Sequence, residues 1–385
     1  MNRDLILIAL SLMTWGIGEG MFFYFQPLYL KELGASPVLI GIILGATGLV
    51  MAITHIPAGY LSDKVGRKPL ILISWIGGLV AAWVMAFATT LPVFITGLLI
   101  YNVTAFVMSP LNSYITAARG KLSVGRALTF ISAFYSAGAI LGPFIGGQIG
   151  GRLGLHTIYR ISASIFIVSV LIILFIRPQA IDAHPDQSKA KQLHLNSRHV
   201  TYLAIVFLVM FATYLPQPLT PNFLQEYRNI SVERLGQFGS IASIGIVILN
   251  LALGSLNAHI SFVLAQICVG FFALLIWRGN GIPWYMIGYF LMGGYRAART
   301  LAAAQTRMLV HQANMGLAYG ITEAVGTSAY ILAPPIAGFL YDKNPNLVYI
   351  LGLVLISVSV ITSFLFNPAR KVQSTEPYLR LETME

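Results

Sequence analysis

The chain contains 385 residues, of which 57% are hydrophobic and only 10% are charged, and its mean hydropathy is +0.76. A water-soluble protein could not cover its surface with so few charges, so these values exclude an ordinary soluble domain and make the lipid bilayer the expected solvent. The formal net charge of +11 then favours a membrane-orientation signal over binding to nucleic acid, and the single cysteine, Cys268, excludes a disulfide within the chain and a cysteine-based metal site.

Twelve apolar runs are long enough to cross a hydrocarbon layer of about 30 Å as helices, so we expect an all-α polytopic membrane protein. The expected spans are 5–30, 37–61, 69–88, 91–115, 125–150, 156–176, 200–224, 235–256, 259–277, 282–306, 314–340 and 346–366. A polar segment separates six spans from six, which predicts two pseudo-symmetric six-helix bundles. The expected parts are an N-terminal bundle at 1–176, a cytoplasmic linker at 177–199, a C-terminal bundle at 200–366 and a cytoplasmic tail at 367–385.

The orientation follows from where the basic residues lie. If the N-terminus is cytoplasmic, most lysines and arginines fall in the segments on that same side of the membrane. Basic residues are retained on the cytoplasmic side during insertion, so we expect both termini in the cytoplasm and the protein in the plasma (inner) membrane.

The first span carries Glu19 near or just past the middle of the membrane, about 21 Å into the helix at about 1.5 Å per residue. Trp15, Glu19, Phe22 and Gln26 recur at the spacing of one helical face, which predicts an aromatic-lined stripe that faces a cavity. A charge in hydrocarbon is unfavourable, so this carboxyl needs a role. Three remain open: a proton-coupling site, a permanently neutral hydrogen-bonded group between helices, and a direct contact with substrate.

A charged loop joins the second and third spans, from Gly59 to Pro69. Its basic residues, Arg67 and Lys68 among them, are typical of a cytoplasmic membrane edge, but its acidic residue and its glycines are not explained in that way. The pattern G-x-L-S-D-K-x-G-R-K-P resembles the signature loop of Major Facilitator Superfamily transporters. The resemblance implies that Asp63 and Arg67 hold a cytoplasmic gate closed, while Gly59 and Gly66 permit close helix approach and a sharp turn.

The fifth span contains a second pattern, made by Gly138, Gly142, Pro143, Gly146 and Gly147. Small residues at fourfold spacing let helix backbones touch, and proline can kink a helix, so packing alone is one explanation. The pattern also resembles the fifth-helix motif of drug–proton antiporters, which favours efflux over uptake. Two departures from that branch are Thr129 in place of an earlier glycine and the absence of a basic residue from 98–112.

The later spans hold Arg296 and Arg299 in the tenth and Glu323 in the eleventh, at similar depths, with Tyr289 at helical spacing from the arginines. Arginine keeps its charge in a protein, so each needs an anion or water. We expect one arginine to pair with Glu323 and the other to meet substrate or Glu19. Asn102 and Gln217 are further candidates for the substrate pathway, although amides also bridge helices structurally.

The superfamily resemblance covers the chain from the first span to the last, and it implies two bundles that rock between inward-open and outward-open states, usually in a monomer. We expect a secondary active transporter, most simply a proton-coupled exporter of amphipathic, drug-like molecules. The alternatives are uptake or exchange of an organic anion or metabolite, and a non-transporting membrane sensor or partner subunit. The sequence has no phosphate-binding loop and no nucleophile–base pattern, so we expect no enzyme, cofactor or metal, and partners limited to substrate, the lipid bilayer and protons or another coupling ion.

Overall fold

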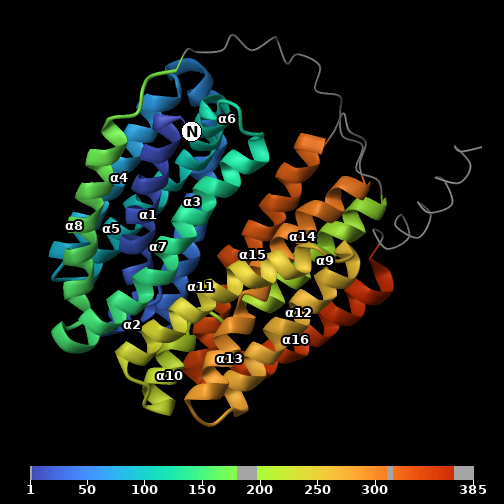
Figure 1. The fold of residues 1–385 in the computed structure, drawn as a ribbon. Helices are drawn as coiled ribbons and strands as arrows, with labels where there is room; N and C mark the ends of the chain where they lie inside the picture. The colour runs from blue at the N-terminus through green and yellow to red at the C-terminus, as the bar shows by residue number, and fades with distance from the viewer. Residues whose placement is uncertain (1, 180–196, 310–314, 368–385) are drawn as a thin grey trace, which may run out of the picture. The chain divides into compact units, whose positions relative to one another are not determined.

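A computed structural model describes residues 2–179, 197–309 and 315–367, and the side chains of these residues other than 55–64, 308 and 315–317. The described residues form helices joined by short turns, with no strand among them. They divide into two compact units. Unit 1 comprises residues 1–186 and 221–243, and unit 2 comprises 187–220 and 244–385 (Figure 1).

Unit 1 contains α1 (Arg3–Phe23), α2 (Gln26–Glu32), α3 (Pro37–Val65), α4 (Arg67–Phe87), α5 (Leu91–Val103), the 3-10 turn η1 (Thr104–Val107), α6 (Met108–Ala118), α7 (Val124–Leu153), α8 (Leu155–Leu174) and α10 (Thr220–Arg228). Unit 2 contains α9 (Ser197–Tyr214), α12 (Ala258–Arg278), α13 (Ile282–Met292), α14 (Gly294–Leu309), α15 (Met315–Lys343) and α16 (Pro345–Phe366). The remaining helix, α11 (Val232–Gly254), begins in unit 1 and continues into unit 2. The domain boundaries expected from the linker stay a prediction, and most of that linker and tail lie outside the described residues.

Eleven of the described helical stretches are long and apolar enough to cross a membrane. This confirms the all-α polytopic class and identifies an integral membrane protein. Three expected spans, 5–30, 200–224 and 282–306, are wrong as single α-helices, because each is divided into two. A fourth, 91–115, is interrupted by the 3-10 turn η1.

The breaks have local causes. Pro27 stands at the start of α2, where it cannot donate a backbone hydrogen bond to the preceding turn. Pro216 and Pro218 lie in the turn between α9 and α10 for the same reason. Gly293 separates α13 from α14, and a Cβ there would lie 2.5 Å from the backbone of Gly245, so the chain breaks where two helices approach closely.

Inside unit 1, α1 packs along both α7 and α8, and α4 packs along α5 and α8 (Figure 1). A buried hydrogen-bond network joins α1, α4 and α8. The Ser11 and Ser169 hydroxyls lie 2.9 Å apart, and the Trp75 indole donates to them at 2.9 and 3.1 Å. In an apolar setting such groups are satisfied by one another, which fixes the register of the three helices.

Unit 2 is built around α12, which packs against α13, α14 and α16, while α9 packs against α15 and α16. The buried amide of Gln266 joins α12 to α16. It donates to the Ser363 hydroxyl at 3.1 Å and accepts from the Ser359 hydroxyl at 2.8 Å. The charged residues expected at the site lie on α14, which packs on α12, and on α15, which packs on α9.

Candidate functional site

Glu19 lies on α1 inside unit 1, where the side chains of Tyr101, Tyr135 and Trp15 form a hydrogen-bond network around it. The Tyr135 hydroxyl of α7 donates to the Glu19 Oε2 at 2.7 Å. The Tyr101 side chain of α5 also hydrogen-bonds Glu19, and the Trp15 indole donates to the Tyr101 hydroxyl at 3.1 Å. Three helices therefore hold the carboxyl in one position. No sequence pattern identified Tyr101 or Tyr135 as its partners.

The rings around this carboxyl form a packed aromatic layer. Trp15 stacks on Phe166 with ring centroids 4.1 Å apart, and Phe22 is 1% exposed and packs on Tyr101 and Tyr159 at centroid distances of 5.4 Å. The layer is thus part of the core of unit 1, and it orders the side chains next to Glu19.

The stripe expected to face a cavity is wrong at two members. Phe22 lies in the core of unit 1, and Gln26 is not on the same helix as the others. α1 ends at Phe23, and Gln26 belongs to the separate helix α2, where it is 7% exposed. The break at the start of α2 changes the helical phase, so spacing counted through it no longer identifies one face.

Replacing Tyr135 with Phe should remove its hydrogen bond to the Glu19 carboxyl and keep the packing around it, because the ring remains and only the hydroxyl is lost. A side-chain hydrogen bond contributes about 1 kcal/mol net, and a loss of that size in the transition state slows transport about fivefold. Thermal unfolding and initial transport rates measure the two effects.

Tyr159→Phe is the matched control, because the buried Tyr159 hydroxyl has no hydrogen-bond partner among the described residues. Its removal should leave both stability and transport near the parent values. Equal effects of the two substitutions would contradict a specific role for the Tyr135 hydroxyl.

One face of the α7 glycine pattern lies directly on α1. A Cβ at Gly138, Gly142 or Gly146 would lie 2.2, 2.5 or 2.3 Å from a backbone oxygen of α1. No side chain fits at such distances, so these three glycines set how close the two helices come. Glu19 and Tyr135 meet because α1 and α7 are this close.

The other face of the pattern packs on the first part of α11, which also belongs to unit 1. A Cβ at Gly147 would lie 2.8 Å from the Cα of Gly236, and one at Gly236 would lie 2.4 Å from the Pro143 carbonyl oxygen. The α7 pattern therefore packs on two helices at once.

The segment expected as a charged loop is almost wholly helical, because α3 continues to Val65 and α4 begins at Arg67. Only Gly66 lies between the two helices. Gly66 has φ of +90°, a conformation that favours glycine, so this residue is required by the turn itself. The Arg67 guanidinium donates to the Gln179 side-chain oxygen at 3.0 Å, and the Gln179 amide donates to the Tyr114 carbonyl at 3.1 Å. Lys68 is partly buried. The surroundings of Gly59 and the side chain of Asp63 lie outside the described residues, so their expected gate role stays a prediction.

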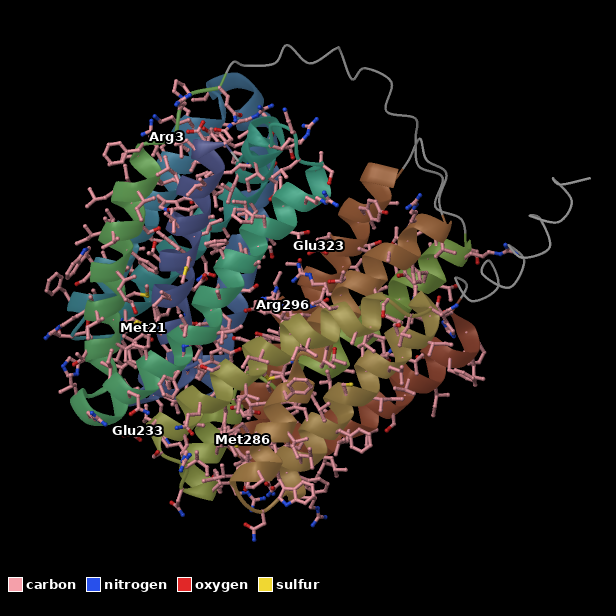
Figure 2. All side chains as sticks on the ribbon, in the orientation of Figure 1. Arg3, Met21, Glu233, Met286, Arg296 and Glu323 are labelled. Carbon is pink, nitrogen blue, oxygen red and sulfur yellow. The ribbon has the colours of Figure 1, made fainter. Side chains whose placement is uncertain are left out.

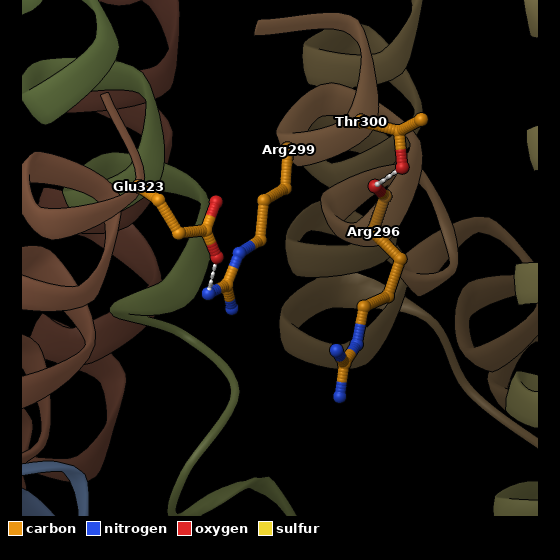
Figure 3. Close-up of polar contacts among 4 residues, drawn as sticks. All are labelled: Arg296, Arg299, Thr300 and Glu323. Carbon is orange, nitrogen blue, oxygen red and sulfur yellow. Dashed lines mark hydrogen bonds and ion pairs between the residues drawn. The ribbon is translucent and has the colours of Figure 1, made fainter. Parts of the chain in front are cut away.

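Unit 2 carries the second group of charges, on α14 and α15 (Figure 2). One of the two arginines is expected to pair with Glu323, and it is Arg299 that does so, with side chains 24% and 52% exposed. Arg296 is exposed, and its side chain points away from that pair (Figure 3). The two arginines, three residues apart, thus have different surroundings.

The other expected pathway residues have local contacts. The Asn102 amide donates to the Leu98 carbonyl at 2.8 Å, and the Gln217 amide donates to the Thr213 carbonyl at 2.7 Å. Tyr289 lies on α13 with 2% exposure and packs edge-on against Phe272, so it belongs to the core of unit 2. Among the described residues, no cluster of histidine, cysteine and acidic side chains could hold a metal ion.

Comparison with known proteins places this architecture in a family. The sequence profile of the Major Facilitator Superfamily matches residues 6–261 and 202–381. The class E tetracycline resistance protein of Escherichia coli is 24% identical over 401 residues, which cover 97% of each chain. The multidrug resistance protein MdtG of Salmonella paratyphi A is 25% identical over 335 residues, covering 81% of this chain and 82% of that protein.

Solved structures agree at the level of the fold. A mutant of the nucleoside transporter NupG superposes with a TM-score of 0.81 at 15% identity, over 95% of this chain and 100% of the other. The human organic anion transporter MFSD10 superposes with a TM-score of 0.65 at 14% identity, over 94% of this chain and 99% of the other. With a profile match along nearly its whole length and this helical architecture, the chain belongs to the Major Facilitator Superfamily of membrane transporters.

Proposed function

We propose that this transporter exports amphipathic organic molecules across the inner membrane in exchange for protons, with both termini in the cytoplasm and one chain as the working unit. The observation that carries the proposal is the Glu19 carboxyl, held by the Tyr135 hydroxyl within a membrane-spanning helix. A carboxyl retained at that depth needs a function, and proton exchange is one that a hydrogen-bonded carboxyl can perform.

Two further observations support export. Relatives that align over most of the chain are named for resistance to tetracycline and to multiple drugs. The α7 glycine pattern, which packs on α1 and α11, is similar to the one found in drug–proton antiporters. In this mechanism Glu19 takes up a proton on one side of the membrane and releases it on the other, and the released energy drives the substrate outward.

Inside-out membrane vesicles test this function directly. With an acidic interior, vesicles that contain the protein should accumulate tetracycline or ethidium, and an ionophore that collapses the pH gradient should stop the accumulation. Vesicles from the same cells without the protein give the background. Accumulation that survives collapse of the gradient would remove proton coupling, and no accumulation of either compound would argue against drug export.

A second candidate function is uptake or exchange of an organic anion. Arg296 favours it, because its exposed positive charge lies on α14 of unit 2, and one structural neighbour is named as an organic anion transporter. Right-side-out vesicles loaded with anion separate the two functions, since an exchanger moves anion in both directions without a pH gradient.

A further inference from the structure

We propose that the ion pair between Lys31 and Glu226 is a latch that holds the outer end of unit 1 closed and opens once in each transport cycle. Lys31 lies on α2 and Glu226 on α10, and both belong to unit 1. The placement at the outer face rests on the proposed function, in which the N-terminus is cytoplasmic. Because α1 then runs outward, α2 at its far end lies on the outer side of the membrane.

Two polar contacts join α2 to α10 (Figure 1). The Lys31 Nζ lies 2.6 Å from the Glu226 Oε1. The Asn222 side-chain amide donates to the Pro27 carbonyl at 3.2 Å. Pro27 stands at the start of α2 and Lys31 near its end. The two contacts therefore hold α10 along the length of α2 rather than at one point.

The two segments in contact are copies of one sequence pattern. Their sequences are Pro-Leu-Tyr-Leu-Lys-Glu at 27–32 and Pro-Asn-Phe-Leu-Gln-Glu at 221–226. Such similarity is typical of transporters built from two related halves. The copies differ in charge or polarity where Lys31 faces Gln225 in the alignment and where Asn222 faces Leu28. Lys31 and Asn222 are the residues that make the two contacts, so the halves differ where the latch needs them to.

The latch is weak enough to open. The Lys31 and Glu226 side chains are 48% and 25% exposed, and an ion pair with this exposure is weak because water competes for both charges. Asn222 is 1% exposed, and its side-chain oxygen accepts no hydrogen bond from a described residue. A buried acceptor without a donor makes the closed contact less favourable. The closed state is thus held by a small net free energy, as a gate that opens in every cycle requires.

Opening of the latch also moves the first part of α11, because only a short turn separates it from α10. In the closed state the Ser240 hydroxyl of α11 donates to the Ile140 carbonyl of α7 at 2.6 Å, and Ser240 is 9% exposed. When α10 leaves α2, α11 is drawn away from α7 and residue 240 becomes exposed. A side chain at this position therefore reports whether the latch is open.

Thiol labelling at position 240 tests the latch. In a Cys268→Ala background, Ser240→Cys introduces one cysteine into the chain. A trimethylammonium methanethiosulfonate reagent, which does not cross membranes, is added to intact spheroplasts and reaches this thiol only from outside. The labelling rate follows the open fraction. Glu226→Gln should raise the rate about two- to fivefold. Lys31→Glu, which sets two carboxylates against each other, should raise it further.

Exchange of the two charges is the decisive variant. Protein with Lys31→Glu and Glu226→Lys together regains an ion pair and should be labelled near the parent rate. Glu32→Gln is the control, because this exposed carboxyl has the place in the first copy that Glu226 has in the second and is not part of the pair. It should leave the labelling rate unchanged, and thermal unfolding shows whether each variant is folded.

Three results would overturn the latch. They are equal labelling of Glu226→Gln and the parent, an equal rise with Glu32→Gln, and fast labelling of the charge-exchanged protein. A response seen only with reagent on the opposite face, in inside-out vesicles, would overturn its placement at the outer side.

Failure of the latch and failure of the proposed function give different results. Drug accumulation in vesicles, with one labelling rate in all variants, would leave export standing and overturn the latch. The expected labelling response without accumulation of any drug would support the latch and argue against drug export.

Discussion

Replacing Glu19 with Gln should reduce gradient-driven drug accumulation to the level of vesicles that lack the protein, while substrate binding and downhill exchange persist. The Gln amide oxygen can still accept the hydrogen bond from Tyr135, so the hydrogen-bond network around residue 19 stays in place. What the amide cannot do is release a proton. Accumulation against a gradient therefore stops, and exchange of labelled for unlabelled substrate continues.

The matched control is Glu32→Gln, which removes an exposed carboxyl at the end of α2 and should accumulate drug as the parent does. Undiminished accumulation by Glu19→Gln would exclude Glu19 from coupling and leave it a structural or substrate-contacting group. Loss of both accumulation and exchange, with normal binding, would indicate a role in the conformational change.

Replacing Gly138 with Ala should destabilise the protein by about 3 kcal/mol or more, because the new Cβ would lie 2.2 Å from the Met13 carbonyl oxygen. The clash is with backbone, so no side-chain rotation relieves it, and α7 must move away from α1. Domains have only about 5–15 kcal/mol of stability in total. A sharp fall in the amount of monodisperse protein after extraction, together with a lower unfolding temperature, is the expected result.

Gly125→Ala on the same helix provides the comparison, since no atom lies within 4 Å of the added Cβ. That substitution should stabilise α7 by about 0.5–1 kcal/mol, because alanine loses less conformational freedom than glycine on entering a helix. Similar unfolding temperatures for the two variants would contradict the backbone contact between α1 and α7.

The spans could be predicted from the sequence because hydropathy over about 20 residues is a strong signal in a chain with so few charges. The breaks within some of them could not, since apolar content continues through Pro27 and Gly293 and only the backbone turns there. Counting through such a break is what placed Gln26 on the face of Glu19. Depth along a helix is a simpler quantity: it sufficed to predict that one of the two arginines pairs with Glu323, but the choice of Arg299 over Arg296 came only from the structure.

The partners of Glu19 depend on contacts between distant parts of the chain. Tyr135 is 116 residues from Glu19 in sequence, and which residue of α7 faces α1 is set by the glycines that allow the approach. The sequence identified those glycines but contained no signal for the tyrosine beside them. Gln179 is similar: it contacts Arg67 from the segment after α8, a position that no motif marks.

We propose that substrate movement and proton movement are coupled through Glu19. Proteoliposomes with a pH-sensitive dye trapped inside and an imposed proton gradient test this coupling. Adding substrate should accelerate dissipation of the gradient when the liposomes hold the parent protein, and should have no effect when they hold Glu19→Gln. Substrate-induced proton flux of equal size in the two preparations, or none in the parent while substrate crosses the membrane, would contradict it.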